Sequence, residues 1–246
     1  MQLKNKVALI TGASKGIGGA TAIAFAKEGC SVIINYRTED ESSRKVLAQC
    51  NGFSEGNMIL KADVTKENQV KKMMDKVTKV YRSLDVLVNN VGIFEKHDSP
   101  TNLEVFKSIF IHNFFSHVLV TKYALCLMKK GKIVNVSSIH GRSGQGRPTA
   151  IAYSAFKAAL ESYTKNLAKD LAPGILVNAI APGRVATPMW GKLTKTDHKR
   201  LGKVHLIARM IEPEEVADGI VFLVKNDAMC GEILTLDGGM SLVTLG

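Results

Sequence analysis

The stretch VALITGASKGIG, residues 7–18, decides the fold. It begins with a short apolar run and passes directly into a loop that contains Gly12, Gly16 and Gly18, after which an apolar helical stretch follows. A short continuous apolar run is typical of a strand that is covered on both faces. The glycines permit a tight turn and let backbone N–H groups approach a pyrophosphate at the N-terminus of the next helix. The stretch therefore predicts a strand, a loop and a helix that bind a dinucleotide.

Similar apolar runs, bounded by turn residues, recur along the rest of the chain and predict further buried strands. They are Val32 to Ile34, Met58 to Leu60, Leu84 to Val88, Ile133 to Val136, Ile175 to Ile180 and Ile233 to Leu236. Segments of helical period lie between them, for example Val70, Met73, Met74, Val77 and Val80.

Strand and helix alternate from residue 1 to residue 246 without a linker rich in proline or glycine and without an internal repeat. This alternation predicts a single α/β domain with a three-layer, doubly wound parallel sheet, the Rossmann fold that binds NAD(P). The least regular stretch is 187–210, where Pro188, Gly191 and Gly202 interrupt any pattern. We expect this stretch to be a lid over the substrate.

Composition narrows the class of protein. The chain is 46% hydrophobic and 22% charged, which is typical of a folded globular protein, and no apolar run approaches the roughly 18 residues of a membrane span. Its 4 cysteines lie far apart, with no CxxC pair and no histidine at a metal-ligand spacing. We therefore expect buried reduced thiols rather than disulfides or a metal site, a cytoplasmic location, and neither a secretory signal nor a membrane partner.

The formal net charge of +11 raises the question of an anionic partner. The basic residues are dispersed, and the short groups at 129–132 and 198–200 are neither interleaved with aromatic residues nor set in a nucleic-acid motif. The charge is compatible with an ordinary solvated surface or with an acidic carrier or anionic substrate. We do not expect nucleic acid as a partner.

The end of the second predicted strand bears on the choice of cofactor. It reads Asn35-Tyr36-Arg37, and the first carboxylate after it is Glu39. A carboxylate at this strand end would repel a 2′-phosphate, whereas Arg37 can hold one, with Lys15 of the glycine-containing loop as a second cation. NADP(H) is favoured over NAD(H), unless both cations are merely solvated. Asp63 follows the third strand, where it can meet the adenine amino group or cap a helix.

Tyr153 and Lys157 are the candidate acid-base pair. Residues 153–157 read Tyr-Ser-Ala-Phe-Lys and open a helix with an apolar stripe, so Tyr153 and Lys157 lie on one helical face. A free phenol has a pKa of about 10, and a nearby ammonium stabilises the phenolate. The spacing on its own is common on protein surfaces, but here a loop hydroxyl, that of Ser138, follows the fifth strand.

The neighbouring polar residues have both functional and structural interpretations. Ser138 can hold a substrate oxygen or form a turn before Gly141. His140 and His112 lie near the candidates in sequence, but we expect His140 to border the pocket and His112 to be an ordinary helix residue.

Taken together, the motifs of this chain resemble those of the single-domain short-chain dehydrogenase/reductases. The resemblance covers nearly the whole chain in the right order. It rests on Thr11 to Gly18, Asn89-Asn90-Val91-Gly92, Asn113, Ser138, Tyr153 with Lys157, Pro182-Gly183 with Thr187, and Asp237-Gly238-Gly239. Val91 departs slightly from the family, which usually has a small alanine there, so local packing is in question more than chemistry.

The resemblance implies roles for individual residues. Ser138 would orient a carbonyl oxygen, Tyr153 would protonate it, Lys157 would hold the nicotinamide ribose and lower the tyrosine pKa, and Asn113 would support a water relay. Hydride would pass from the cofactor to the carbonyl carbon. The implied cofactor-binding residues are Gly12, Ser14, Lys15, Gly16, Ile17, Gly18, Arg37, Asp63, Val64, Asn89, Val91, Gly92, Tyr153, Lys157, Pro182, Gly183 and Thr187.

Within this family the chain is most similar to 3-oxoacyl-[acyl-carrier-protein] reductases of fatty acid biosynthesis, and Lys129 with Lys130 would suit an acidic acyl carrier protein. The turn 171–175 lacks the arginine that such reductases often place there. A sugar, steroid or small ketone is the alternative substrate, and an NADP-binding regulatory protein without catalysis is a more remote one. The resemblance also implies a homotetramer that pairs long helices and the sheet edge near 237–239, a role for which Phe110, Phe114 and Phe115 offer apolar surface.

Overall fold

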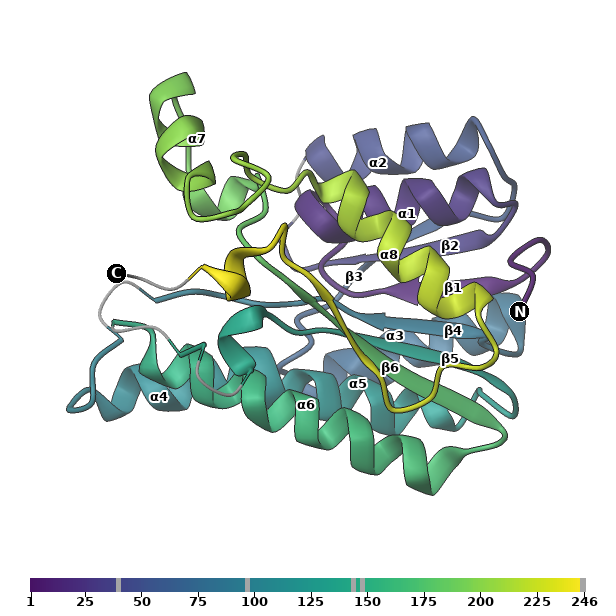
Figure 1. Cartoon of the computed structure of the whole chain (residues 1–246). Helices are drawn as coiled ribbons and strands as arrows, with labels where there is room; N and C mark the ends of the chain where they lie inside the picture. Colours follow the sequence, from purple (N-terminus) through teal and green to yellow (C-terminus); the bar gives the residue numbers. More distant parts are fainter. Residues whose placement is uncertain (39–40, 96–97, 143–144, 147–148, 244–246) are drawn as a thin grey trace.

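The computed structural model describes residues 1–38, 41–95, 98–142, 145–146 and 149–243. Its strands form one parallel sheet of 7 strands in the order β3-β2-β1-β4-β5-β6-β7 (Figure 1). The direction of winding reverses between β1 and β4, where open α/β sheets bind ligands beyond the carboxyl ends of their strands. The strands are β1 (Val7–Ile10), β2 (Ser31–Tyr36), β3 (Met58–Lys61), β4 (Val86–Asn89), β5 (Gly131–Val136), β6 (Ile175–Pro182) and β7 (Ile233–Leu236).

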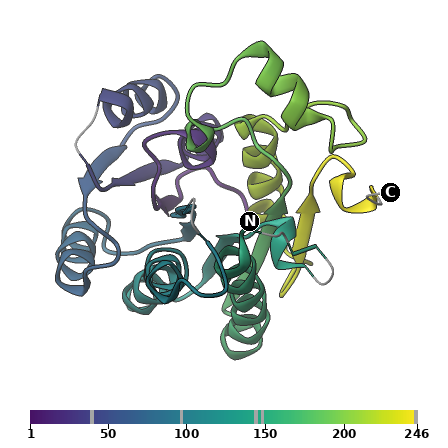
Figure 2. The same cartoon turned by 90° about the vertical axis from the view of Figure 1, so that its left-hand side faces the viewer.

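Helices cover both faces of the sheet, as the view along the strands in Figure 2 shows. Helices α1, α2 and α8 pack on one face, and α3, α5 and α6 pack on the other. A π-helical turn, Ile111–Phe115, joins α4 to α5. The helices are α1 (Gly16–Lys27), α2 (Glu41–Asn51), α3 (Glu67–Tyr81), α4 (Leu103–Phe110), α5 (Ser116–Leu125), α6 (Ile151–Leu171), α7 (Lys195–Gly202) and α8 (Pro213–Lys225).

The predicted fold class is confirmed, and each predicted strand is present with small shifts at its ends. The strands are buried on both faces because two helical layers enclose them, which is why their sequences read as continuous apolar runs. The apolar stripe of α3 is buried at Val70, Met73, Met74 and Val77. Val80 departs from the prediction, since it is 60% exposed near the end of the helix.

A third apolar cluster lies where α4 and the π-helical turn meet the start of α6. Phe110 and Phe114 pack against it, and the ring of Phe114 lies 5.8 Å from that of Tyr163. Phe110 and Phe114, two of the three phenylalanines expected to offer apolar surface to another subunit, therefore pack within the chain. Phe115 remains 57% exposed.

One stretch is more regular than its sequence suggests, and one expectation about the cysteines needs correction. The stretch 187–210 contains a regular helix, α7, which begins with a capping box made by Thr194 and Asp197. The helix was missed because it is short and polar and so carries no apolar period. Of the cysteines, only Cys30 and Cys50 are buried, whereas Cys126 and Cys230 are exposed free thiols.

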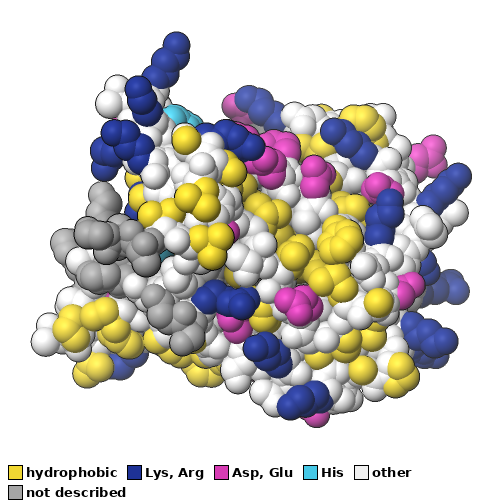
Figure 3. Space-filling model, viewed as in Figure 1, with side chains coloured by type: hydrophobic (Ala, Val, Ile, Leu, Met, Phe, Trp, Pro, Cys, Tyr) yellow, Lys and Arg dark blue, Asp and Glu magenta, His cyan; other side chains and the backbone are white. Residues whose placement is uncertain are grey.

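The space-filling view shows how the charge is distributed over one face. Lys and Arg side chains are scattered over this face among acidic ones, and a group of them lies over α7 (Figure 3). Among the described residues, no helix is both long enough and apolar enough to cross a membrane.

Candidate active site

The glycine loop, residues 11–18, is held in place by two asparagine side chains. The buried Asn35 of β2 accepts a hydrogen bond from the Gly12 backbone N–H at 3.3 Å and donates to the carbonyls of Leu60 and Ala62 on the β3 side. Asn90 donates to the carbonyls of Thr11 and Gly12 at 2.9 and 3.1 Å. The loop is therefore anchored to the strands on both sides of β1 by uncharged amides.

The start of α1 fits a bound pyrophosphate. Lys15 is the N-cap residue, but its side chain makes no cap hydrogen bond, and the first turn contains no acidic residue. Backbone N–H groups at such a helix start attract an anion. Gly12 and Gly16 have φ values of +61° and +57°, and a Cβ atom at Gly18 would lie 2.5 Å from the Asn90 Nδ2 and 2.7 Å from the Gly12 carbonyl oxygen.

Two predicted cofactor-binding residues from distant parts of the chain lie beside the glycine loop. A Val91 methyl group lies 3.0 Å from the position that a Cβ atom of Gly12 would take, and a Thr187 methyl group lies 3.3 Å from the corresponding position at Gly16. The larger side chain of Val91 thus packs into space that Gly12 leaves open. The structure brings the glycine loop together with the loops after β4 and β6.

Of the other predicted members of these two loops, Asn89 and Pro182 are buried, whereas Gly92 and Gly183 are half-buried. Pro182 ends β6 and is buried. The next residue, Gly183, is close to His205 and Asp237, because an added Cβ atom would lie 2.9 Å from the His205 Nε2 and 3.0 Å from the Asp237 carbonyl oxygen. The buried side-chain amide of Asn89 donates to Thr121 and Asn135 within the protein, and its role in cofactor binding stays a prediction. Gly92 lies against Asn113, at 3.8 Å from the Oδ1.

Arg37 and Asp63 lie near each other at the ends of β2 and β3. Arg37 is exposed, Asp63 is half-buried and Val64 is buried. Burial alone would raise the pKa of Asp63, but hydrogen bonds from Thr65 and the positive charge of Arg37 outweigh it and lower that pKa. Asp63 accepts from the Thr65 hydroxyl at 2.8 Å and does not cap α3, whose N-cap residue is Lys66. Glu39 lies outside the described residues.

Ser138, Tyr153 and Lys157 come together beyond the end of β5. The Tyr153 phenol hydrogen-bonds with the Ser138 side chain, and the Lys157 Nζ lies 5.6 Å from the centre of the tyrosine ring. Lys157 is buried and donates a 2.6 Å hydrogen bond to the Val136 carbonyl. All three side chains thus lie together, as predicted from the helical spacing of Tyr153 and Lys157 and from the position of Ser138 after a strand.

Burial displaces the pKa values of both titratable groups of this trio. It raises the pKa of Tyr153 to about 12, although the hydrogen bond with Ser138 acts in the opposite direction. It also lowers the pKa of Lys157 to about 7, against the attraction of Glu161. In this structure burial dominates for both groups, because loss of water disfavours the charged form of each side chain, and a lowering of the tyrosine pKa by a charged Lys157 stays a prediction.

Aromatic rings enclose Tyr153. Its ring meets those of Phe94, Phe156 and His140 edge to face, at centroid distances of 5.7, 5.2 and 6.5 Å. His140 therefore borders the site, as expected, and its Nδ1 is hydrogen-bonded with the Gln145 carbonyl at 2.9 Å. His112 pairs through its Nδ1 with the Ser108 carbonyl one helical turn earlier, as an ordinary helix residue does.

Asn113 lies in the π-helical turn and is fully buried. Its amide clamps one residue of the loop after β4: Oδ1 accepts from the Ile93 N–H at 2.6 Å, and Nδ2 donates to the Ile93 carbonyl at 2.8 Å. Both polar groups of the Asn113 side chain are therefore hydrogen-bonded to Ile93. The water relay that the resemblance implies for Asn113 stays a prediction. π-Helical turns are often found at functional sites.

Sequence reasoning missed two buried polar residues near this trio. His117 is hydrogen-bonded to the Val91 carbonyl at 2.8 Å, and burial lowers its pKa to about 3, so it is neutral at physiological pH. Asp98 is 2% exposed, and its carboxylate accepts from the backbone N–H groups of Ala152 and Tyr153 at 2.9 and 3.0 Å. Neither residue lies in a recognisable motif, and the Asp98 contacts span more than 50 residues of chain.

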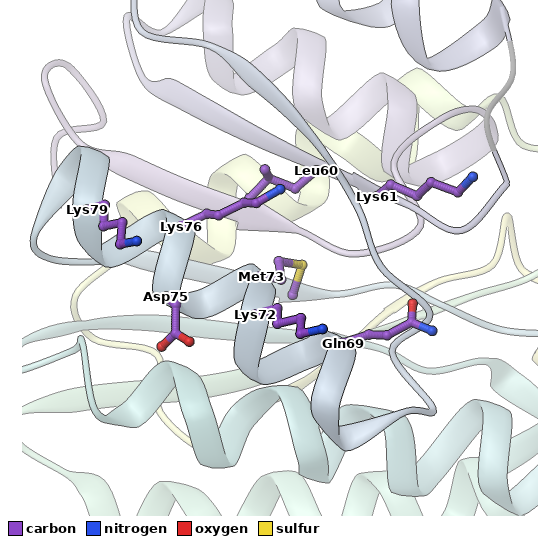
Figure 4. A pocket seen from close by; sticks show the side chains of 8 residues that line it. All are labelled: Leu60, Lys61, Gln69, Lys72, Met73, Asp75, Lys76 and Lys79. Atoms are coloured by element: carbon purple, nitrogen blue, oxygen red, sulfur yellow. The ribbon is translucent and has the colours of Figure 1, made fainter.

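A surface groove between β3 and α3 is separate from this site (Figure 4). Lysine side chains surround a floor that includes Leu60 and Met73, and none of the predicted site residues lines the groove. Its lining residues are Leu60, Lys61, Gln69, Lys72, Met73, Asp75, Lys76 and Lys79.

Comparison with known proteins gives consistent matches over nearly the whole chain. The family model described as enoyl-(acyl carrier protein) reductase matches residues 12–241. A 3-oxoacyl-[acyl-carrier-protein] reductase from Synechocystis sp. is 36% identical over 97% of this chain and 98% of its own. The structure is similar to that of ligand-free aldohexose dehydrogenase from Thermoplasma acidophilum, with a TM-score of 0.86, 30% identity and coverage of 99% and 97%. A double mutant of a short-chain dehydrogenase/reductase from Serratia marcescens has a TM-score of 0.90, 26% identity and coverage of 98% and 100%.

Proposed function

Because the chain belongs to the short-chain dehydrogenase/reductase family of oxidoreductases, we propose that it reduces a carbonyl to a secondary alcohol with NADPH, with Tyr153 as the proton donor. The observation that carries the proposal is the trio formed by the buried Ser138 and Lys157 and the half-buried Tyr153, beyond the carboxyl end of β5 and at the same edge of the sheet as the loop that fits a pyrophosphate. A nicotinamide bound there would supply the hydride.

The protonation state of Tyr153 suits reduction. A phenol with a pKa of about 12 keeps its proton at neutral pH and can donate it to a carbonyl oxygen held by the Ser138 hydroxyl. As the proton leaves, a charged Lys157 and the Ser138 hydroxyl would stabilise the phenolate in a site with little water. Burial lowers the pKa of Lys157 to about 7, so we expect this lysine to be able to take up a proton during the cycle.

NADPH is proposed as the cofactor on the basis of two exposed cations. Arg37 follows β2, and Lys15 lies at the start of α1. Both positions are at the edge of the sheet where the adenosine half of a dinucleotide binds in this type of fold. Asp63 partly offsets the charge of Arg37, so we expect a preference for NADPH rather than an absolute requirement.

For the substrate we propose a 3-oxoacyl group presented as a thioester on an acidic acyl carrier protein. Lys129 and Lys130 precede β5 and so lie at the opposite edge of the sheet from Ser138, about 20 Å away along the six-residue strand. The basic group of α7 lies at the same edge as Ser138 (Figures 1 and 3). We therefore expect the acidic surface of the carrier protein to contact α7. A Lys199→Glu and Arg200→Glu double variant tests this contact, and a Lys129→Glu and Lys130→Glu double variant serves as the comparison.

Turnover on a panel of carbonyls tests the proposal. NADPH oxidation would be followed with an acetoacetyl thioester, simple ketones and aldoses, and the thioester is expected to give the highest kcat/KM. A sugar would take first place if the alternative substrate class applies, as the likeness to an aldohexose dehydrogenase allows. Tight NADPH binding without turnover on any of these carbonyls would instead favour a regulatory protein.

A homotetramer is proposed as the working assembly. The support is apolar surface that the chain leaves uncovered, namely Phe115 at 57%, Phe222 at 50% and Leu242 at 75% exposure. Light scattering at micromolar concentration should give four times the 26.7 kDa chain mass. A monomeric mass would rule the assembly out.

A further inference from the structure

The first turn of α6, the helix that carries Tyr153, has no cap of its own. Its N-cap residue is Ala150, which has no polar side chain, and Thr149 before it has a positive φ of 64°. The first N–H groups of a helix have no partner within the helix, and a buried helix start leaves them unsatisfied unless another group accepts from them. Much of this helix start is shielded, since Ala150 and Ala152 are both fully enclosed, although the Ile151 side chain between them is exposed.

Asp98 supplies the missing cap from the loop between β4 and α4. One carboxylate oxygen accepts from the Ala152 N–H at 2.9 Å, and the other accepts from the Tyr153 N–H at 3.0 Å. The carboxylate is 2% exposed and faces the positive end of the α6 dipole, where a negative charge is stabilised. A buried bidentate contact of this kind fixes both the position and the direction of the helix start.

The same loop is tied down a second time close to the reacting groups. Asn113 holds both backbone groups of Ile93, and the ring of Phe94, the next residue, meets the Tyr153 ring at 5.7 Å. Tyr153 is thus held at its backbone by Asp98, at its ring by Phe94 and at its hydroxyl by Ser138. Loss of the backbone contact would let the phenol move relative to Ser138, and displacements of about 1 Å can lower a rate about a hundredfold.

We propose that Asp98 is a positioning residue for proton transfer: its buried carboxylate caps α6 and thereby holds the Tyr153 phenol against Ser138. The inference rests on the proposed role of Tyr153 and adds a residue that lies outside every motif of the sequence. It also gives the loop after β4 a function in chemistry, since that loop connects the Asn113 clamp to the start of the catalytic helix.

The test compares Asp98→Ala and Asp98→Asn with Asn102→Ala. Asn102 caps α4 from the same loop, accepting from the Val105 N–H at 3.2 Å, so its variant removes a helix cap without touching α6. Two readouts are needed. The first is kcat per nucleotide-binding site, determined by titration so that unfolded protein is not counted, together with the nucleotide Kd. The second is hydrogen exchange at the Ala152 and Tyr153 amides.

We expect Asp98→Ala to lower kcat at least tenfold, to leave the nucleotide Kd within threefold, and to speed exchange at both amides at least tenfold. Asp98→Asn should fall between this variant and the wild type, because it keeps one of the two accepting oxygens and replaces the other with an NH2 group, which cannot accept from a backbone N–H. It also serves as the test if Asp98→Ala does not fold. Asn102→Ala should change neither readout.

Two results would overturn the inference. Unchanged exchange in both Asp98 variants would show that the carboxylate does not cap α6, and faster exchange with kcat within twofold of the wild type would show that the cap does not position the phenol. A failure of the proposed function looks different, because it leaves turnover unchanged in Tyr153→Phe. In that case hydrogen exchange at the Ala152 and Tyr153 amides still shows whether Asp98 caps α6. The proposed role of Asp98 in catalysis would then be wrong together with that of Tyr153.

Discussion

The glycine loop and the Ser138, Tyr153 and Lys157 trio are built by opposite means. The loop is anchored by the uncharged amides of Asn35 and Asn90, and it offers backbone N–H groups whose state does not depend on pH. The trio uses titratable side chains, and burial moves two of their pKa values to about 12 and about 7. We therefore expect nucleotide binding to depend on the backbone shape of the loop, and proton transfer to depend on the burial of the trio's titratable groups.

Lys157 is proposed to serve both nucleotide binding and proton transfer, so its removal should have the largest effect. We expect Lys157→Ala to lower kcat/KM about a thousandfold or more and to weaken nucleotide binding as well, because the buried Nζ lies beside the Tyr153 ring and is proposed to hold the nicotinamide ribose. Steady-state kinetics and nucleotide titration measure both effects. Lys169→Ala, an exposed lysine on the same helix, is the control. Loss of turnover with intact nucleotide binding would confine Lys157 to the trio.

Nucleotide binding by the glycine loop should depend on the shape of the loop and not on pH. A Cβ atom at Gly18 would lie 2.5 Å from the Asn90 amide and 2.7 Å from the Gly12 carbonyl, so Gly18→Ala must displace the loop. We expect nucleotide affinity to fall about thirtyfold or more at every pH between 6 and 9. Gly174→Ala, where an added Cβ meets nothing closer than 3.4 Å, should bind as the wild type does. A strongly pH-dependent loss would contradict the contrast between the two regions.

The sequence predicts the two regions unequally well, for physical reasons. The glycine loop depends on residues close together in the chain, and the strands around it are continuous apolar runs, so both follow from local pattern. Tyr153 and Lys157 follow from helical spacing, and Ser138 from its place after a strand. The Asp98 cap and the Asn113 clamp join residues that are 20 or more positions apart and leave no periodic pattern. The displaced pKa values depend on burial in the folded chain, and the polar helix α7 carries no apolar stripe.

Arg37 should give a smaller effect, confined to the choice between cofactors. NADPH is expected to be preferred over NADH at least tenfold, since a charge-assisted contact contributes about 1.5 to 3 kcal/mol and 1.4 kcal/mol already gives a factor of ten. Arg37→Asp should reverse the preference while leaving kcat with NADH unchanged, as kcat/KM for both cofactors would show. The wild-type preference should also shrink as salt increases. Equal use of both cofactors by the wild type would mean that the 2′-phosphate is not recognised at this position.

The smallest effect is a change in how stability depends on pH. Burial lowers the pKa of Lys157 to about 7 from an ordinary 10.5, so between these values the unfolded chain binds more protons than the folded one. The free energy of unfolding should therefore rise with pH from about 7 to 10, and Lys157→Met should lose at least about 1 kcal/mol of that rise. Chemical denaturation at pH 7, 8.5 and 10 measures it, with Lys169→Met as the control. Parallel pH profiles for wild type and Lys157→Met would mean that the buried lysine keeps its ordinary pKa.

Tyr153→Phe tests the central claim most directly, because it removes one hydroxyl and keeps the ring that packs against Phe94 and Phe156. The measurement is NADPH oxidation with the best carbonyl substrate, alongside the NADPH dissociation constant of the same preparation. We predict that kcat falls at least a hundredfold while the dissociation constant stays within threefold, since the proton donor is lost and the glycine loop is untouched. A variant that retains most of the wild-type kcat would contradict the assignment of Tyr153 as the proton donor.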